Sequence, residues 1–151
     1  SIQPVRDYRY VAAARKYEAG GTANYPGAVG LAASLRIFLE LGQDRIAEHV
    51  WRLGETLMAG LDRLGVALCT PRERAERAGI VTFSLGTPER NAAAVEHLLA
   101  RRVLVSLRYT AEVGGVRVAC HFFNNESDIE RLLEALVEYL RGAGVSSSSP
   151  K

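Results

Sequence analysis

Two stretches of this 151-residue chain carry residues whose types and spacing could support chemistry. The first is the loop 19–27, in which the adjacent Gly20 and Gly21 allow backbone N–H groups to converge on an anion. The Thr22 hydroxyl and the Asn24 amide add side-chain donors. A phosphate group would fit this loop, although its spacing matches neither a phosphate loop ending in Gly-Lys-Ser/Thr nor the pattern G-x-G-x-x-G. The same composition is typical of a plain turn before a helix.

The second is Arg117, in the middle of the run 116–120. Alternation along a strand points Val116 and Val118 to one face and Arg117 to the other. A guanidinium is a planar fork that can hold a carboxylate through two parallel hydrogen bonds, so an arginine that opens toward a cleft suits carboxylate binding. The competing interpretation is an arginine on the solvent face of a one-sided sheet. Both interpretations also apply to Arg108, which we expect one residue beyond the preceding strand.

The cysteines and histidines point to no further site. Cys69 and Cys120 are too few for a disulfide framework and lack zinc-ligand spacing, so we expect buried thiols and no metal site. His121 follows Cys120 directly, and adjacent strand residues face opposite ways, which disfavours a Cys–His dyad. We expect Cys120 in the core and the His121 side chain in a hydrogen-bonded position at the surface or rim. His49 and His97 are expected on solvated helix surfaces.

Lysine forms Schiff bases with carbonyl groups, and the chain has only Lys16 and Lys151 beside 17 arginines. Lys16 lies in a charged run and Lys151 ends a serine-rich tail, so neither is expected to be a buried, activated amine. The net charge of +2 gives no reason to expect a nucleic-acid partner. No apolar run approaches the roughly 20 residues that span a membrane, and the chain shows no signal-peptide pattern, so we expect a cytoplasmic protein without a membrane partner.

An alternation of helices and strands must position these residues. Apolar residues at helical spacing predict four helices, at 26–41, 43–64, 90–101 and from about 126 to 141. The first should be half-buried. Trp51 and Met58 widen the apolar surface of the second, and we expect them to pack within the chain.

The start of the last helix carries two possible caps. Asn125 or Ser127 can accept from the free N–H groups of the first turn, and Ser127 with Glu130 fits a capping box.

Four short runs have the pattern of strands, at 66–69, 79–85, 103–107 and 116–120. The turn-rich segment 108–115 is expected as a medium loop between the last two. The fold class is therefore α+β, with a small, mostly antiparallel sheet of about four strands that helices cover on one face.

Three stretches together resemble a known family. They read RKYEAGGTAN at 15–24, PGAVGL at 26–31 and GVRVACHFFNNESDI at 115–129. In order and spacing they look like the class V aminotransferases, which are pyridoxal-phosphate enzymes of fold type I and include cysteine desulfurases, kynureninase-like enzymes and isopenicillin-N-epimerase-like proteins. The resemblance spans about residues 13–141 and corresponds to the C-terminal portion of such an enzyme.

The resemblance implies roles for the two chemical stretches. The position of Thr22 implies a contact with the cofactor phosphate of the other subunit of a homodimer, with Gly21 and Asn24 shaping the loop. Arg117 matches the arginine that holds the α-carboxylate of an amino-acid substrate, and Arg108 is a candidate second substrate-binding residue.

The resemblance also implies what the chain lacks. In the family, the lysine that binds pyridoxal phosphate lies upstream of the glycine-threonine loop, before Ser1, so the chain alone is expected to be inactive. A cysteine desulfurase would need a mobile cysteine between the last two strands, and 108–115 contains none. We therefore expect an aminotransferase-like or epimerase-like enzyme rather than a sulfur-transferring one.

The expected organisation has four parts. They are the end of the large domain with the phosphate loop at 1–25, connecting helices at 26–64, a small C-terminal α+β domain at 65–142 and a disordered tail at 143–151. The chain begins without an initiator methionine, as expected of a processed protein or a segment of a longer one. Two other interpretations stay open: a stand-alone α+β binding module without catalysis, and a dimerisation domain that uses the helices at 26–64.

Overall fold

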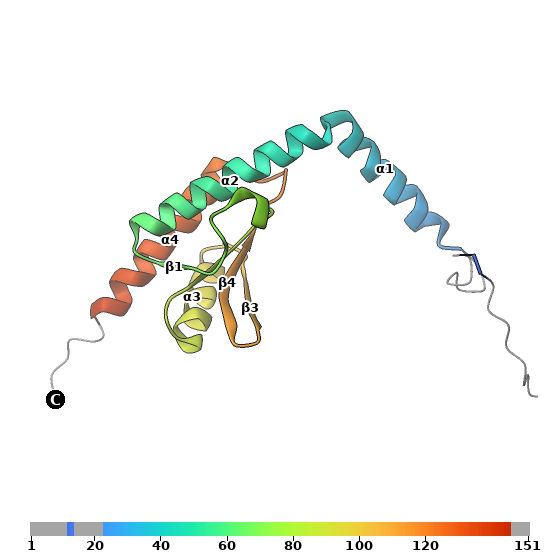
Figure 1. The fold of residues 1–151 in the computed structure, drawn as a ribbon. Helices are drawn as coiled ribbons and strands as arrows, with labels where there is room; N and C mark the ends of the chain where they lie inside the picture. The colour runs from blue at the N-terminus through green and yellow to red at the C-terminus, as the bar shows by residue number, and fades with distance from the viewer. Residues whose placement is uncertain (1–11, 14–22, 146–151) are drawn as a thin grey trace, which may run out of the picture. The chain divides into compact units, whose positions relative to one another are not determined.

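The computed structural model describes residues 12–13 and 23–145, and the chain divides into two compact units, Ser1–Ile37 and Phe38–Lys151. In the first unit the described element is the N-terminal part of helix α1 (Tyr25–Leu41). The second unit holds the last turn of α1 and all the other described elements (Figure 1).

Helix α1 begins at a side-chain cap. The Asn24 Oδ1 accepts a hydrogen bond from the Gly27 N–H at 3.0 Å, which satisfies one free N–H group of the first turn. None of the residues of α1 is buried, so the prediction of a half-buried helix is wrong. In the described part of its own unit, α1 has no second helix or strand against which its apolar residues could pack.

Four antiparallel strands form the sheet in the order β1-β2-β4-β3. They are β1 (Ala67–Leu68), β2 (Ile80–Ser84), β3 (Ser106–Thr110) and β4 (Val113–Ala119). Helices α2 (Gln43–Arg63) and α3 (Pro88–Ala100) pack on the sheet, and α4 (Glu126–Val145) packs against both helices (Figure 1). A short 3-10 helix, η2 (Arg74–Glu76), precedes β2. The predicted α+β class and four-stranded antiparallel sheet are confirmed.

The core lies between one face of the sheet and the helices. Alternate residues of the two central strands point into it, where they meet apolar side chains at helical spacing on α2, α3 and α4. The completely buried members are Leu53, Leu57, Leu61, Val81, Phe83, Ala94, Leu98, Val116 and Leu136. Because these strand residues use one face, the intervening residues are left for the opposite face of the sheet.

The connection between β3 and β4 is shorter than predicted. Thr110 and Val113 pair across the two strands, so Ala111 and Glu112 alone form the turn. Both have positive φ, 48° and 66°, which the tight turn of a twisted hairpin requires. The prediction of a medium loop at 108–115 is wrong, and Arg108 lies inside β3 rather than beyond a strand end.

A reciprocal cap opens α4. The Asn125 Oδ1 accepts from the Asp128 N–H at 3.2 Å, and the Asp128 Oδ2 accepts from the Asn125 N–H at 3.1 Å. Ser127 lies inside the first turn and donates its hydroxyl to the Asn125 Oδ1 at 2.6 Å. Asn125 is therefore the cap, and the predicted capping box of Ser127 with Glu130 is wrong.

Ion pairs hold the segment 72–77 against α2. Three acidic residues of the helix pair with three arginines of the segment: Asp62 with Arg72 at 2.7 Å, Glu48 with Arg74 at 2.5 Å and Glu55 with Arg77 at 3.3 Å. The guanidinium groups of Arg74 and Arg77 also lie 4.9 and 4.7 Å from the centroid of the Trp51 ring. Trp51 thus packs within the chain, as does the buried Met58, and that prediction is confirmed.

Candidate active site

The face of the sheet opposite the core carries the candidate substrate residues. Residues paired between neighbouring strands point to the same face, so the register places Arg117 of β4 between Thr82 of β2 and Ser106 of β3. Arg108 of β3 lies on this face too, directly opposite Gly115 of β4. The two arginines singled out in the sequence therefore share one surface, which we call the open face.

The side chain of Arg117 is held at one end and free at the other. Arg117 is half-buried, and its Nε–H donates a hydrogen bond to the Ser106 Oγ at 3.2 Å. Within the described residues, its two terminal nitrogens have neither a hydrogen-bond partner nor an ion-pair partner. A guanidinium in this state presents its terminal fork to a carboxylate. Sequence reasoning missed Ser106, although two-residue alternation with Arg108 would have placed it on the same face.

Two glycines let β4 approach its neighbours closely. A Cβ at Gly115 would overlap the carbonyl oxygen of Phe83 in β2, and a Cβ at Gly114 would overlap the carbonyl oxygen of Arg108 in β3. Any other residue would therefore push the strands apart. Gly115 itself is buried, and a Cβ there would also lie 3.2 Å from the Asn91 side-chain nitrogen.

Neither thiol has the surroundings of a nucleophile. Cys120 is buried, as predicted, and burial raises the pKa of its thiol. Cys69 is exposed, so the prediction of a buried thiol is wrong there; its Sγ donates to the carbonyl oxygen of Gly114 at 3.6 Å. Partial desolvation raises the pKa of Cys69 as well. Raised pKa values lower the thiolate fraction at neutral pH, which is the opposite of activation.

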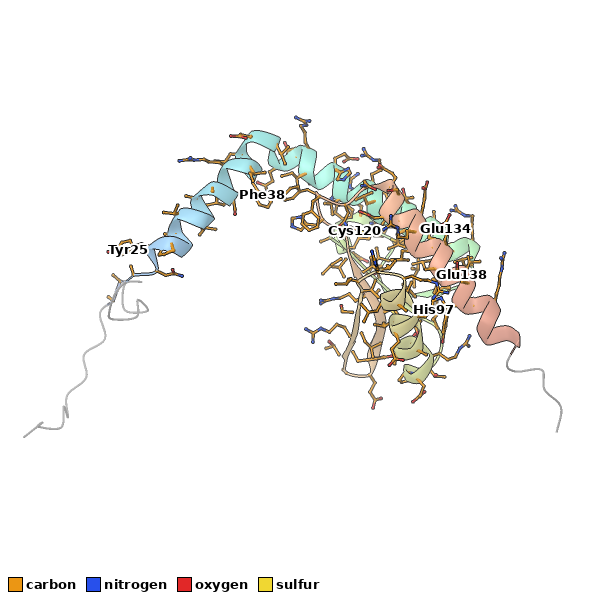
Figure 2. All side chains as sticks on the ribbon, turned by 180° about the vertical axis from the view of Figure 1, so that it is seen from behind. Tyr25, Phe38, His97, Cys120, Glu134 and Glu138 are labelled. Carbon is orange, nitrogen blue, oxygen red and sulfur yellow. The ribbon has the colours of Figure 1, made fainter. Side chains whose placement is uncertain are left out.

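Two histidines differ from the prediction of solvated helix surfaces. His49 is half-buried, with its Nε2 2.8 Å from the carbonyl oxygen of Asn124 and its Nδ1 2.9 Å from an Arg52 terminal nitrogen. Arginine only donates, so Nδ1 accepts and Nε2 carries the proton. His97 is half-buried where α3 meets α4 (Figure 2). Its ring centroid lies 5.5 Å from that of Tyr139. These contacts tie elements together and do not reach the open face.

His121 lies beside the end of β4 among aromatic side chains. Its ring stacks on Phe123, with the centroids 4.5 Å apart and 23° between the planes. Its backbone N–H donates to the Asn124 Oδ1 at 3.0 Å and its carbonyl oxygen accepts from the Asn124 N–H at 3.0 Å, whereas its ring has no hydrogen-bond partner among the described residues. The predicted surface or rim position of His121 is confirmed, because the residue is exposed, but within the described residues its ring makes aromatic contacts and not the predicted hydrogen bond.

The predicted phosphate loop is described only at its end. Gly21 and Thr22 lie outside the described residues, as do both lysines. Asn24 uses its side-chain oxygen as the cap of α1. In the described ranges, no cluster of His, Cys, Asp or Glu could bind a metal ion. Within those ranges, too, every helix falls short of the length and apolarity needed to cross a bilayer.

Comparison with known proteins identifies the family. The profile described as Aminotransferase class-V matches residues 2–132. The chain belongs to this family. A probable cysteine desulfurase of Pyrococcus abyssi is 29% identical over 150 aligned residues, which cover 90% of the chain and 36% of that relative. A probable cysteine desulfurase of Aeropyrum pernix is 31% identical over 138 residues, covering 83% and 33%.

Solved structures of a cysteine desulfurase and of a cystine C-S lyase share the fold. The apo cysteine desulfurase of Thermococcus onnurineus superposes with a TM-score of 0.76 at 26% identity, over 94% of this chain and 37% of that one. A cystine C-S lyase in complex with cysteine persulfide gives 0.67 at 28% identity, over 78% and 30%. A mutant of the same lyase carries glycine covalently linked to pyridoxal phosphate. This chain thus spans about a third of the length of the relatives that it matches.

The described residues of this class V chain fit one end of a pyridoxal-phosphate site. The terminal nitrogens of Arg117, unbonded among the described residues, have the geometry to bind a carboxylate group. The described ranges contain no lysine, so a cofactor-linking amine is not found among them.

Proposed function

We propose that the chain is the substrate-carboxylate part of a pyridoxal-phosphate enzyme that acts on an amino acid. The observation that carries this proposal is Arg117, which is held through its Nε and keeps its terminal nitrogens free on the open face. Family membership and a relative with glycine linked to pyridoxal phosphate support the cofactor.

In this proposal Arg117 binds the α-carboxylate by two parallel hydrogen bonds and fixes the orientation of the amino acid. Arg108 contacts the distal part of the substrate, because it shares the open face and has no ion-pair partner in the described part of the chain. A substrate with a second acidic group would profit from this arginine.

When bound, pyridoxal phosphate supplies the electron sink for reactions at the α-carbon. Thr22 donates its hydroxyl to the phosphate group of the other subunit in a homodimer, and Gly21 and Asn24 shape the loop that presents it. The lysine that links the cofactor and moves the α-proton belongs to the two thirds of the relatives that this chain does not match. The chain alone is then inactive.

The turn of Ala111 and Glu112 bears on the type of reaction. A mobile cysteine between β3 and β4 cannot be accommodated, because the two strands are joined by these two residues and neither is cysteine. We therefore propose an aminotransferase-like or epimerase-like reaction. L-Cysteine still belongs among the first substrates tried, since the matched relatives are named cysteine desulfurases.

The test begins with the gene region upstream of the codon for Ser1. We expect an in-frame segment that contains the cofactor lysine, and we call the protein that includes it the completed protein. It should retain pyridoxal phosphate after dialysis, seen as visible absorbance, whereas the present chain should not. A start codon directly before Ser1 and no cofactor binding would contradict the proposal.

A variant of the completed protein tests the role of Arg117. Arg117→Ala should raise the KM for amino acids by the equivalent of about 2–4 kcal/mol, because it removes a bidentate charged contact. Unchanged kcat/KM values for L-alanine and L-cysteine would rule out this role.

A further inference from the structure

Ser106 and Arg117 form a closed pair on the open face. They lie directly opposite each other on β3 and β4, and the Arg117 Nε–H donates to the Ser106 Oγ at 3.2 Å. The same hydroxyl donates to the carbonyl oxygen of Arg117 at 3.5 Å. Both residues are half-buried. The serine hydroxyl thus joins the backbone of Arg117 to the first nitrogen of its guanidinium group.

This arrangement selects which edge of the guanidinium stays available. The group has five N–H donors in one plane, and the hydrogen on Nε is used by Ser106. The four hydrogens on the terminal nitrogens are unused within the described residues. A carboxylate can therefore meet the terminal edge end-on with both oxygens.

The Arg117 Nε–H donates to a neutral hydroxyl group, so this hydrogen bond does not neutralise the positive charge of the guanidinium. A carboxylate at position 106 would also accept from Nε, but it would neutralise the arginine that has to attract a substrate carboxylate. The register assigns to the open face a set of residues without an acid: Ala67, Ile80, Thr82, Ser84, Ser106, Arg108, Thr110, Val113, Gly115, Arg117 and Ala119. The strand residues of this described surface therefore offer Arg117 no carboxylate as an ion-pair partner.

We propose that Ser106 is a positioning residue for carboxylate recognition: it fixes the guanidinium of Arg117 without neutralising it. The role of Ser106 in substrate binding rests on the function proposed above. The hydrogen bond between the Ser106 Oγ and the Arg117 Nε does not depend on that function. Ser106 acts through Arg117 and touches no reacting atom.

Thr82 provides a matched control. It lies directly opposite Arg117 on β2, as Ser106 does on β3, and it is a half-buried hydroxyl residue of the same face. Among the described residues the Thr82 hydroxyl forms no hydrogen bond with Arg117. The backbone of Thr82 is bonded instead, since its N–H donates to the Thr70 Oγ1 at 2.7 Å and its carbonyl oxygen accepts from the Cys69 N–H at 2.8 Å. If removing any hydroxyl group beside Arg117 were enough to disturb the guanidinium, Thr82→Ala should have the same effect as Ser106→Ala.

The first experiment uses the chain itself. The Nε–Hε signal of Arg117, assigned by its loss in Arg117→Lys, is followed by NMR at slightly acidic pH. Ser106→Ala should shift this signal and speed its exchange with water severalfold, Ser106→Thr should restore it, and Thr82→Ala should leave it near the original position. A signal unmoved by Ser106→Ala would overturn the proposal.

The second experiment uses the completed protein with L-alanine and L-cysteine as probes. Ser106→Ala should raise KM about tenfold with kcat changed less than twofold, the size expected for one hydrogen bond to a charged group. Ser106→Thr should recover the original KM, and Ser106→Asp should raise KM more than Ser106→Ala, because its carboxylate competes with the substrate. In the Arg117→Ala background, Ser106→Ala should have no further effect; an equal tenfold effect there would overturn the proposal.

The two experiments separate the two proposals. If the NMR signal responds as expected but the completed protein neither binds the cofactor nor turns over an amino acid, the proposed function fails while the contact between Ser106 and Arg117 stands. If the completed protein is active and Ser106→Ala leaves KM unchanged, the function stands and the positioning role is overturned.

Discussion

Thr110 lies directly opposite Val113 across β3 and β4, so the two strands are joined by two residues. This pairing brings Arg108 into the body of a strand and gives the open face a rigid edge. A surface built on paired strands holds its side chains more precisely than a long loop would. Arg108, Ser106 and Arg117 therefore lie on one continuous face of the paired strands.

Glu112→Gly should stabilise the chain. Glu112 has φ 66°, a left-handed conformation that costs a non-glycine residue about 1 kcal/mol, and glycine adopts it without that cost. We expect a rise in the free energy of unfolding of about that size in urea titrations. Glu112→Pro should do the reverse, because proline cannot take a positive φ. A destabilised Glu112→Gly would contradict the assigned turn.

Asn91→Ala should lower the free energy of unfolding more than most single substitutions. The buried Asn91 accepts from the Leu85 N–H at 2.7 Å and donates to the Tyr109 hydroxyl at 2.8 Å. Its removal leaves a buried N–H without a partner, which costs about 1–3 kcal/mol. Tyr109→Phe removes only the more exposed contact and should cost less. Thermal or urea unfolding of both variants checks this order, and an equal or larger loss for Tyr109→Phe would contradict it.

Gly60→Ala should destabilise the contact of α2 with α4. A Cβ at Gly60 would overlap the Leu133 side chain, and overpacking of this kind typically costs about 1–3 kcal/mol. Gly142→Ala is the control, since Gly142 also lies in a helix but has open space around it. Alanine there should be neutral or stabilising. The cost of Gly60→Ala should shrink in a Leu133→Ala background, and purely additive effects would count against the contact.

The stability of the chain should fall in acid partly through Asp128. The bond from the Asn124 side chain and that from the Asn125 N–H lower the pKa of this carboxyl. Its folded pKa thus lies below the unfolded value of about 3.9, so its stabilising contribution is present above that value and is lost as pH falls through the folded pKa.

Urea titrations across the acid range check this. The stability difference between the original chain and Asp128→Asn should shrink below about pH 4. Glu130→Gln is the control for removing one carboxylate from the same helix, because the Glu130 carboxylate has no hydrogen-bond partner among the described residues, whereas Asp128 has two. A constant difference between the original chain and Asp128→Asn at every pH would refute the assignment.

Cys69 should react with iodoacetamide before Cys120. Cys69 is exposed and Cys120 is buried, and both pKa values are raised, so labelling at neutral pH should be slow at the first site and negligible at the second. Mass spectrometry of peptides after timed labelling measures both sites. A Cys69→Ser chain should take up label only when denatured, and native labelling of Cys120 would argue against its burial.

The helices of the second unit could be predicted from the sequence almost to their ends. Helix α2 was expected at 43–64 and lies at Gln43–Arg63, because its buried leucines recur at a spacing that a strand cannot produce. The fold class follows from the same patterns. The family resemblance is confirmed by the match over residues 2–132.

The β3–β4 hairpin could not be placed from local patterns. Gly114 and Gly115 have the composition of a turn, but they lie inside β4, where backbone atoms of two neighbouring strands approach them. The real turn, Ala111 and Glu112, contains neither glycine nor asparagine. The register of β4 depends on the close approach of Gly114 and Gly115 to the neighbouring strands, and Phe83 of β2 lies far from Gly115 in the sequence.

The candidate site was found in part. Arg117 and Arg108 were singled out by residue type, and the structure brings them to one face. Ser106 was missed because a lone serine in a strand has no distinctive pattern until its opposite residue is known. The partners of His49 were missed for a similar reason, since Asn124 lies 75 residues away in the sequence.

The packing of Arg74 and Arg77 around Trp51 turns the single tryptophan of the chain into a reporter of one contact. Indole emission depends on the charges beside the ring and on exposure to water. Separation of the segment 72–77 from α2 would remove both cations and wet the ring, while the helices would still dominate circular dichroism. The chain therefore carries its own optical probe for the release of this segment, distinguishable from unfolding of the whole domain.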